Sequence, residues 1–460
     1  MKTNRNKTKA AMAFSFFALV ALTACSTQPV SPLDKETLAA PTNPKIVKRA
    51  EMQRALSQTA YDSYCAFAEN FVPFILSSAN LNESVALSLP DAYLAFALTA
   101  YSSTEPAQGE FLDFLGLESK EECFNAAKEI RDVFSTLSEE REGAYSGGYN
   151  LNSFWVDLSR LYVKEGKEAE FQKIADAFDV AIFSEGLTKQ AAKNYFETYG
   201  LEGYPYPSLD LPDDPAAGAV MSVFYCLDSF DDPVLFEREY QSKNHYIDYF
   251  LNGVSHPVDY LEFFELVAPV YEGDGFLGAK QTINHLNAGF FLPDEGKAPK
   301  DIFADVVAGN YDYKHYVSQE TGETLMEYHR TIEAPYFQVD SSLTVAKKEL
   351  DSRFPKSQQS GVFENLFGAK NGYPLTLDQI MQGSTMRFDY NGFYSCSATV
   401  ITYTDSAAFG SEGIEDFTLT LDRPYVFTME KPGVQVEGKY LSVPMIYGMI
   451  YDPNYPAYSQ

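Results

Sequence analysis

Histidine is the side chain with the widest chemical use, and this 460-residue chain has five of them. They are His245, His256, His285, His315 and His329. No two of them stand four residues apart, the spacing that places two ligands on one face of a zinc-binding helix, and no Cys-x-x-Cys pair accompanies them. The sequence therefore predicts no metal site.

The glycine-rich stretch GDGFLG at 273–278 has the spacing of a dinucleotide-binding loop. It lacks a clear preceding strand, however, and the following residues do not read as the helix of a βαβ unit. The chain also has no G-x-S-x-G elbow and no P-loop. Its 64 Asp and Glu residues are too abundant for any pair to stand out as an acid and a base. We therefore expect neither an enzyme nor a cofactor.

The run GFYSCSATVITYTDSAAFG at 392–410 is unusual for another reason. One glycine precedes two aromatic rings, and five small residues then follow in succession, from Ser395 to Thr399. So small a run cannot form a core by itself. It is either an exposed loop or a strand kept slim so that it can enter a crowded sheet.

The N-terminus has the features of an export signal. Positive side chains at the start precede a short apolar run, which ends in Leu22-Thr23-Ala24-Cys25. This ending resembles a bacterial lipobox, so we expect residues 1–24 to be a lipoprotein signal peptide and Cys25 to carry the lipid. An ordinary signal peptide is the alternative. The Pro-, Ser- and Thr-rich residues that follow predict a flexible tether over 25–47, before a single domain over 48–460.

The net charge excludes one class of partner. It is -29 for the whole chain, and removal of the four positive residues in 1–24 makes it -29 - 4 = -33. Nucleic acid is therefore not expected as a partner, and a membrane is expected only through the lipid, on the extracytoplasmic side. Four further cysteines, Cys65, Cys123, Cys226 and Cys396, allow three complete disulfide pairings, and free thiols are equally compatible with their spacing.

Periodicity predicts helices mainly in the first half and strands in the second, which favours an α+β fold. Helices are expected from about Lys48 to Phe71 and at 90–101, 120–137, 168–179, 187–198 and 342–350. Strands are expected at 218–227, 246–251, 257–265, 284–292, 325–340, 380–390, 416–421, 424–430 and 443–450.

Seven segments, in order, resemble the serpin family of protease inhibitors. They are LSLPDAYLAFAL (87–98), NSFWVD (152–157), FDVAIFSEGL (178–187), GAVMSVFYCLDSF (218–230), FFLPDEGK (290–297), APYFQVDSSL (334–343), and DRPYVFTMEK (422–431) together with MIYGMIYDP (445–453). The resemblance implies three β-sheets, about eight or nine helices and an exposed reactive-centre loop. It further implies a monomeric, non-enzymatic suicide inhibitor of serine proteases, with cysteine proteases as a second target class. A non-inhibitory binding protein of the same fold is the alternative.

The resemblance assigns Gly392 to the hinge of the reactive loop. After cleavage, the loop of a serpin enters the central sheet as a new strand, so alternate side chains become buried. These would be Phe393, Ser395, Ser397 and Thr399. Phe393 departs from the small residue usual there, and overpacking by its ring would cost about 1–3 kcal/mol and slow insertion.

Family spacing places the reactive bond at Ser406-Ala407. The loop is longer than usual, so Tyr403, Phe409 and Glu412 are alternative sites. No Lys or Arg occurs from Phe388 to Asp422, which predicts elastase-like or subtilisin-like targets, chymotrypsin-like ones second, and no trypsin-like ones.

Four other departures from the family pattern concern the region under the central sheet. Asp91 replaces a usual Ser, Ser222 a usual Asn, Gln382 a usual His and Phe230 a usual Trp. Because the first three positions form a polar cluster in serpins, we expect the hydrogen bonds of that cluster to be altered here.

Overall fold

A computed structural model of the protein describes most of the chain. The described residues are 37–39, 55–136, 138–141, 144–200, 206–207, 209, 211, 216–229, 246–282, 285–319, 321–359, 361–370, 375–389, 392–396 and 414–453. The expected signal peptide and Cys25 lie outside them. None of the helices in this part of the chain is long and apolar enough to cross a membrane.

Eight α-helices occur in the described residues. They are α2 (Gln58–Leu76), α3 (Pro90–Ser102), α4 (Ala107–Phe114), α5 (Lys120–Phe134), α6 (Glu168–Phe178), α7 (Lys189–Tyr199), α9 (Pro299–Ala308) and α10 (Lys347–Arg353); the 3-10 helix η2 (Lys356–Gln358) follows. The side chains of Ser57, Ser119 and Thr188 accept a hydrogen bond from the first turn of α2, α5 and α7. These N-caps explain why the three helices begin where they do.

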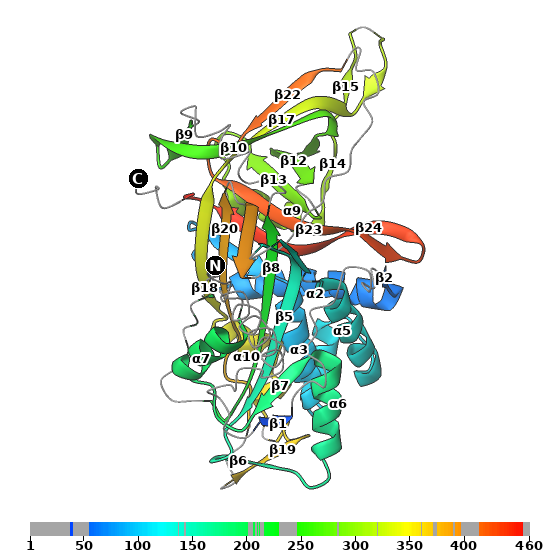
Figure 1. Cartoon of the computed structure of the whole chain (residues 1–460), viewed down its shortest axis with the longest axis vertical. Coiled ribbons are helices and arrows are strands. Elements are labelled where there is room, and N and C mark those ends of the chain that lie inside the picture. The colour runs from blue at the N-terminus through cyan, green and yellow to red at the C-terminus, as the bar shows by residue number, and fades with distance from the viewer. Residues whose placement is uncertain are drawn as a thin grey trace, which may run out of the picture.

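The largest sheet, which we call the central sheet, contains eight strands (Figure 1). Their order is β1 (Thr37–Ala39), β7 (Val180–Phe183), β5 (Ala144–Val156), β8 (Gly218–Ser229), β21 (Gly392–Cys396), β20 (Met381–Asp389) and β18 (Phe337–Thr344), with β4 (Ser138–Arg141) paired to β5. Only β5 and β7 pair in parallel.

Two further large sheets complete the upper part of the molecule in Figure 1. A four-stranded sheet has the order β22 (Asp416–Thr420), β17 (Glu327–Pro335), β10 (Val254–Pro269) and β9 (Tyr246–Leu251). An eight-stranded sheet has the order β14 (Tyr311–Tyr313), β11 (Tyr271–Gly273), β12 (Phe276–Thr282), β13 (Asn287–Pro293), β23 (Tyr425–Val436), β24 (Lys439–Ile450) and β3 (Val85–Ser88), with β2 (Ala55–Leu56) paired to β23. Two small ribbons pair β15 (Tyr316–Val317) with β16 (Thr324–Leu325), and β6 (Leu161–Val163) with β19 (Phe367–Ala369).

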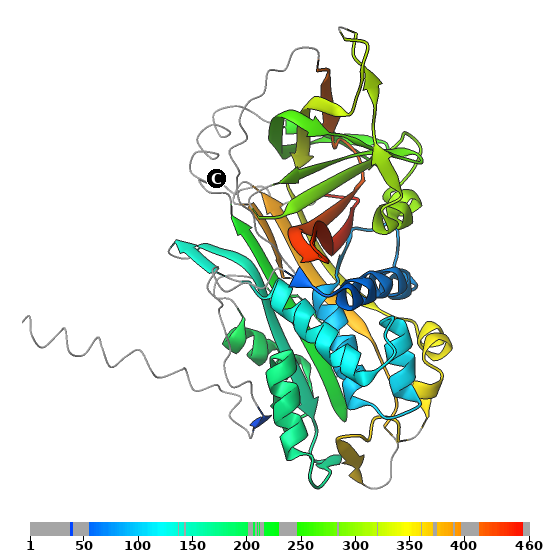
Figure 2. The same ribbon diagram turned by 90° about the vertical axis from the view of Figure 1, so that its right-hand side faces the viewer.

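Helices cover both faces of the central sheet. Figure 2 shows α2, α3 and α5 on one face, with α7 on the opposite face. The side under α7 is a separate small core, in which Trp155 stacks on Phe183 at 4.5 Å and meets the edge of Tyr195 at 5.9 Å. The main core fills the other side and continues into the eight-stranded upper sheet.

The α+β organisation agrees with the sequence, while two expected elements differ. The helix expected at 342–350 begins at Lys347, because Ser342 to Thr344 instead continue β18 and pair with β20. The single strand expected at 325–340 is two strands, β17 and β18, which belong to different sheets.

The GDGFLG stretch forms a tight hairpin between β11 and β12. Gly273 pairs with Phe276 across the turn, and Gly275 has a φ of 81°, a backbone conformation that glycine adopts readily. The spacing of these glycines therefore reflects an antiparallel turn and not a phosphate-binding loop.

Candidate functional site

The beginning of the small-residue run lies inside the central sheet. Strand β21 runs antiparallel to both of its neighbours, and Phe393 is opposite Phe388 of β20 on one side and Asp228 of β8 on the other. Gly392, at the start of β21, has a φ of 122°, which a residue with a side chain rarely adopts. The glycine thus permits the chain to enter the sheet at this point.

Phe393 is seated in the main core. Its residue is 2% exposed, and its ring stacks on Phe427 of β23 with 5.3 Å between centroids and 25° between planes. Phe427 also meets the ring of Phe337 at 5.2 Å. The sequence led us to expect that this ring would resist entry into the sheet. In the structure it occupies a place in a cluster of phenylalanines, where its burial stabilises β21.

The next residues of β21 alternate between the two faces, as strand geometry requires. Ser395 is buried on the same side as Phe393, opposite Cys226 of β8. Tyr394 is partly buried against the small core on the α7 side. The other predicted site residues, Ser397, Thr399, Ser406 and Ala407, lie outside the described residues, as do Tyr403, Phe409 and Glu412.

Beyond β21, part of the central sheet has unpaired strand edges. Strand β21 pairs with residues 225–229 of β8 and 385–389 of β20. Within the described residues, no strand pairs with the facing edges of β8 at 218–224 or of β20 at 381–384. We call these edges the unfilled edges. Each carries backbone groups that another strand would satisfy.

Gln382, on the unfilled edge of β20, joins a buried polar cluster with Ser88 and Asp91. The Gln382 amide nitrogen donates to the Ser88 carbonyl at 2.6 Å and to Asp91 Oδ2 at 3.4 Å, while its oxygen accepts from the Ser88 backbone N–H at 3.3 Å. The Ser88 hydroxyl donates to Asp91 Oδ1. This cluster ties β20 to the end of β3 and the first turn of α3.

Asp91 is almost fully buried, and burial raises the pKa of its carboxyl to about 6. Hydrogen bonds from Ser88 and Gln382 act in the opposite direction but do not compensate for the loss of hydration. The sequence indicated that the polar cluster would change at this position. It gave no sign that the new carboxyl would be held by the new glutamine, because the two residues are 291 positions apart.

Comparison with known proteins was made by sequence and by structure. No protein-family model matches the chain, and no curated protein matches it significantly. Solved structures do match. The thermophilic serpin Tengpin in its native state has a TM-score of 0.57 at 15% identity, over 93% of this chain and 100% of that one. The fold is that of a serpin.

Two other serpin structures show the same likeness. Serpin48 of the insect Tenebrio molitor has a TM-score of 0.56 at 15% identity, over 85% of this chain and 97% of its own. Human thyroxine-binding globulin, complexed with its hormone, has a TM-score of 0.59 at 13% identity, over 86% and 100%. The latent state of Tengpin matches with 0.58, close to the 0.57 of its native state, so overall similarity does not distinguish between these two states.

The third altered position of the serpin polar cluster, Ser222, lies apart from the other two in its hydrogen bonding. Its hydroxyl donates to Asn152 Oδ1 on β5, and the Asn152 amide nitrogen donates to the Phe178 carbonyl at 2.7 Å. Ser222 therefore joins β8 to β5, whereas Gln382 joins β20 to α3. Phe230 lies outside the described residues.

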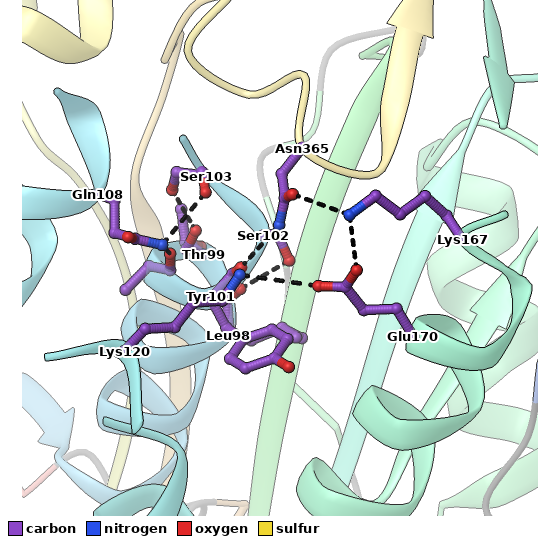
Figure 3. Close-up of polar contacts among 11 residues, drawn as sticks. Leu98, Thr99, Tyr101, Ser102, Ser103, Gln108, Lys120, Lys167, Glu170 and Asn365 are labelled. Carbon is purple, nitrogen blue, oxygen red and sulfur yellow. Dashed lines mark hydrogen bonds and ion pairs between the residues drawn. The ribbon is translucent and has the colours of Figure 1, made fainter. Parts of the chain in front are cut away.

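At the opposite end of the unfilled edges, a polar network joins the two halves of the serpin sheet (Figure 3). The Lys167 ammonium donates to Glu170 at 2.7 Å and to the Asn365 side-chain oxygen at 3.3 Å, and Asn365 donates to the Tyr101 carbonyl at 3.3 Å. The β6–β19 ribbon lies in the same segments. Because β6 follows β5 and β19 precedes β20, these contacts hold the base of the sheet together while β21 enters from the other end.

Three of the cysteines are free thiols in the described residues: Cys65, Cys123 and Cys226. Burial raises the pKa of the Cys123 thiol to about 12, so this residue is not a nucleophile at neutral pH. Cys396 lies at the end of β21, opposite Tyr225. Within the described part of the chain, no group of three His, Cys, Asp or Glu side chains is placed to hold a metal ion.

Proposed function

We propose that the protein is a serpin-type inhibitor of serine proteases, with cysteine proteases as a second class of target. The observation that carries the proposal is the position of β21. The segment that resembles the hinge of a reactive loop has entered the central sheet between β8 and β20, and both neighbours have unfilled edges along which the same strand would continue.

The proposed mechanism uses these edges directly. The nucleophile of the protease attacks the carbonyl carbon of the scissile bond, which breaks to release a new amine on the downstream fragment and leaves an acyl-enzyme. The upstream arm then extends β21 along 218–224 of β8 and 381–384 of β20. Since the protease is covalently attached to that arm, it is carried across the molecule before water can hydrolyse the ester.

The residue types that follow β21 support this extension. Continued alternation would place Ser397 and Thr399 on the buried side after Phe393 and Ser395. Small hydroxyl side chains fit in a closed sheet with little displacement of the core beneath. The base of the sheet stays joined by the network around Lys167 and Asn365, so only the upper part needs to open.

The absence of Lys and Arg from 388–422 leads to our first prediction, on specificity. A trypsin-like pocket presents a carboxylate that would stay unpaired, so cleavage in the loop should be about 100- to 1,000-fold slower than by an elastase-like enzyme. With elastase-like or subtilisin-like proteases we expect a covalent complex that survives a denaturing gel, and a C-terminal fragment that begins at Ala407. A stable trypsin complex with a fragment that begins after Arg423 would contradict both the site and the specificity.

A non-inhibitory binding protein is the second candidate. Two observations favour it: Phe393 replaces the small residue usual at the first inserted position, and one of the matched structures is a thyroxine-binding globulin with bound thyroxine. Under this alternative the loop would be cleaved by elastase-like enzymes without any covalent complex. The same gel therefore separates the two functions.

We also propose that the protein is anchored on the extracytoplasmic side of a bacterial membrane by a lipid on Cys25, through a tether over 25–47. This rests on the lipobox-like Leu22-Thr23-Ala24-Cys25. Our second prediction is that Cys25→Ala removes the acceptor thiol and moves a folded protein from the membrane fraction to the soluble fraction. Cys65→Ala, which keeps the lipobox, is the matched control. Unchanged membrane recovery of Cys25→Ala would exclude the lipid anchor.

A further inference from the structure

The Ser88–Asp91–Gln382 cluster lies where the central sheet would open. Both polar atoms of the Gln382 amide are used by Ser88, and its nitrogen also reaches the Asp91 carboxylate. Gln382 belongs to the unfilled edge of β20, whereas Ser88 and Asp91 belong to β3 and α3. Movement of β20 away from β8 therefore breaks these hydrogen bonds and exposes the carboxyl of Asp91 to water.

The surroundings of Asp91 supply no cation. The groups with the largest influence on it are its own burial, the side chains of Ser88 and Gln382, and backbone N–H groups. The titratable side chain that faces it from α2 is Tyr64, which in turn faces Tyr447 of β24, and burial holds the pKa of both phenols well above its ordinary value. Asp91 is thus the group of this cluster that changes charge between pH 4 and pH 8.

The direction of the coupling follows from proton linkage. A carboxyl with a higher pKa in the closed sheet than in water binds its proton more tightly in the closed sheet. Protonation therefore stabilises the closed sheet. Ionisation, which occurs as pH rises through about 6, favours any opening that hydrates the carboxylate.

We propose that Asp91 is a proton-operated lock on the central sheet: its protonated form holds β20 closed, and its ionised form promotes separation of β20 from β8. The lock rests on the proposed opening of the sheet, but it does not depend on protease inhibition. It would restrict loop insertion in acidic surroundings and permit it at neutral pH.

Hydrogen exchange of backbone amides in peptides from β8 and β20 tests the lock, and this is our third prediction. Protection factors, which already remove the intrinsic pH dependence of exchange, should fall as pH rises from 4 to 7.5 in the wild-type protein. The increase in opening should approach 100-fold, the limit set by a pKa of about 6 in the closed sheet and 3.8 in water, and should level off above pH 7. Asp91→Asn should open at the low, acidic level throughout this range.

Asp340→Asn is the matched control. Asp340 is an exposed carboxylate of β18 that also accepts a hydrogen bond from β20, through Thr385. Its replacement should leave the pH profile as in the wild type. Asp91→Ser provides a second uncharged variant, and the wild-type profile itself decides if neither variant folds.

A flat wild-type profile, or greater opening at low pH, would overturn the lock while leaving the proposed function intact. Equal protection of β8, β20 and their neighbours at every pH would instead contradict the opening of the sheet, on which the proposed function depends.

Discussion

Replacing Phe393 with alanine should release the start of the proposed reactive loop from the central sheet. The ring is buried against Phe427, and a buried Phe→Ala replacement costs about 3–5 kcal/mol because it loses apolar burial and leaves a cavity. That cost falls on the state in which β21 is inserted. A difference of about 3 kcal/mol corresponds to more than 100-fold more protein with the hinge released. The initial rate of loop cleavage by an elastase-like protease should rise accordingly.

Tyr394→Ala is the matched control for this fourth prediction, because Tyr394 is the adjacent ring and lies only partly buried on the opposite face. We expect its effect on cleavage to be no more than about 10-fold, since less apolar surface is lost. If Phe393→Ala is cleaved at the wild-type rate, and its thermal unfolding is unchanged, then β21 does not depend on this ring and our interpretation of Phe393 is wrong.

Phe393 illustrates what a residue type can and cannot predict. From the sequence, a phenyl ring at the first inserted position meant overpacking, so Phe393→Thr was expected to speed insertion and raise the ratio of trapped to cleaved product. The stacked contact with Phe427 reverses this expectation, because threonine would leave the same cavity as alanine. Size is visible in a sequence, whereas the shape of the receiving core depends on a strand that is distant in the chain.

The elements with strong local signals were predicted well. The strands at 246–251 and 381–389 follow from alternating aromatic and β-branched residues, and α5 follows from helical periodicity after a capping serine. The helix expected at 342–350 was wrong over its first residues, since pairing with β20 outweighs the local helical pattern there. Two helices, α4 and α9, were missed because they are short and lie between segments read as loops.

The candidate site divides in the same way. Family resemblance located Gly392 and the alternation after it, and the structure places Phe393, Tyr394 and Ser395 on alternate faces of a strand. The buried pair of Asp91 and Gln382 required tertiary information, because neither residue is unusual by itself. Its physical consequence, a carboxyl of raised pKa under a movable strand, arises only when the fold removes water from it.

Thermal unfolding before and after loop cleavage tests the central claim most directly, and this fifth prediction carries the largest expected effect. A strand that fills the edges at 218–224 of β8 and 381–384 of β20 adds on the order of ten backbone hydrogen bonds, each of about 0.5–1.5 kcal/mol. We therefore expect the Tm of the cleaved protein to exceed that of the intact protein by at least about 10 °C, with both fragments still associated. An unchanged or lower Tm after complete cleavage would show that the loop does not insert, and would contradict the proposed mechanism.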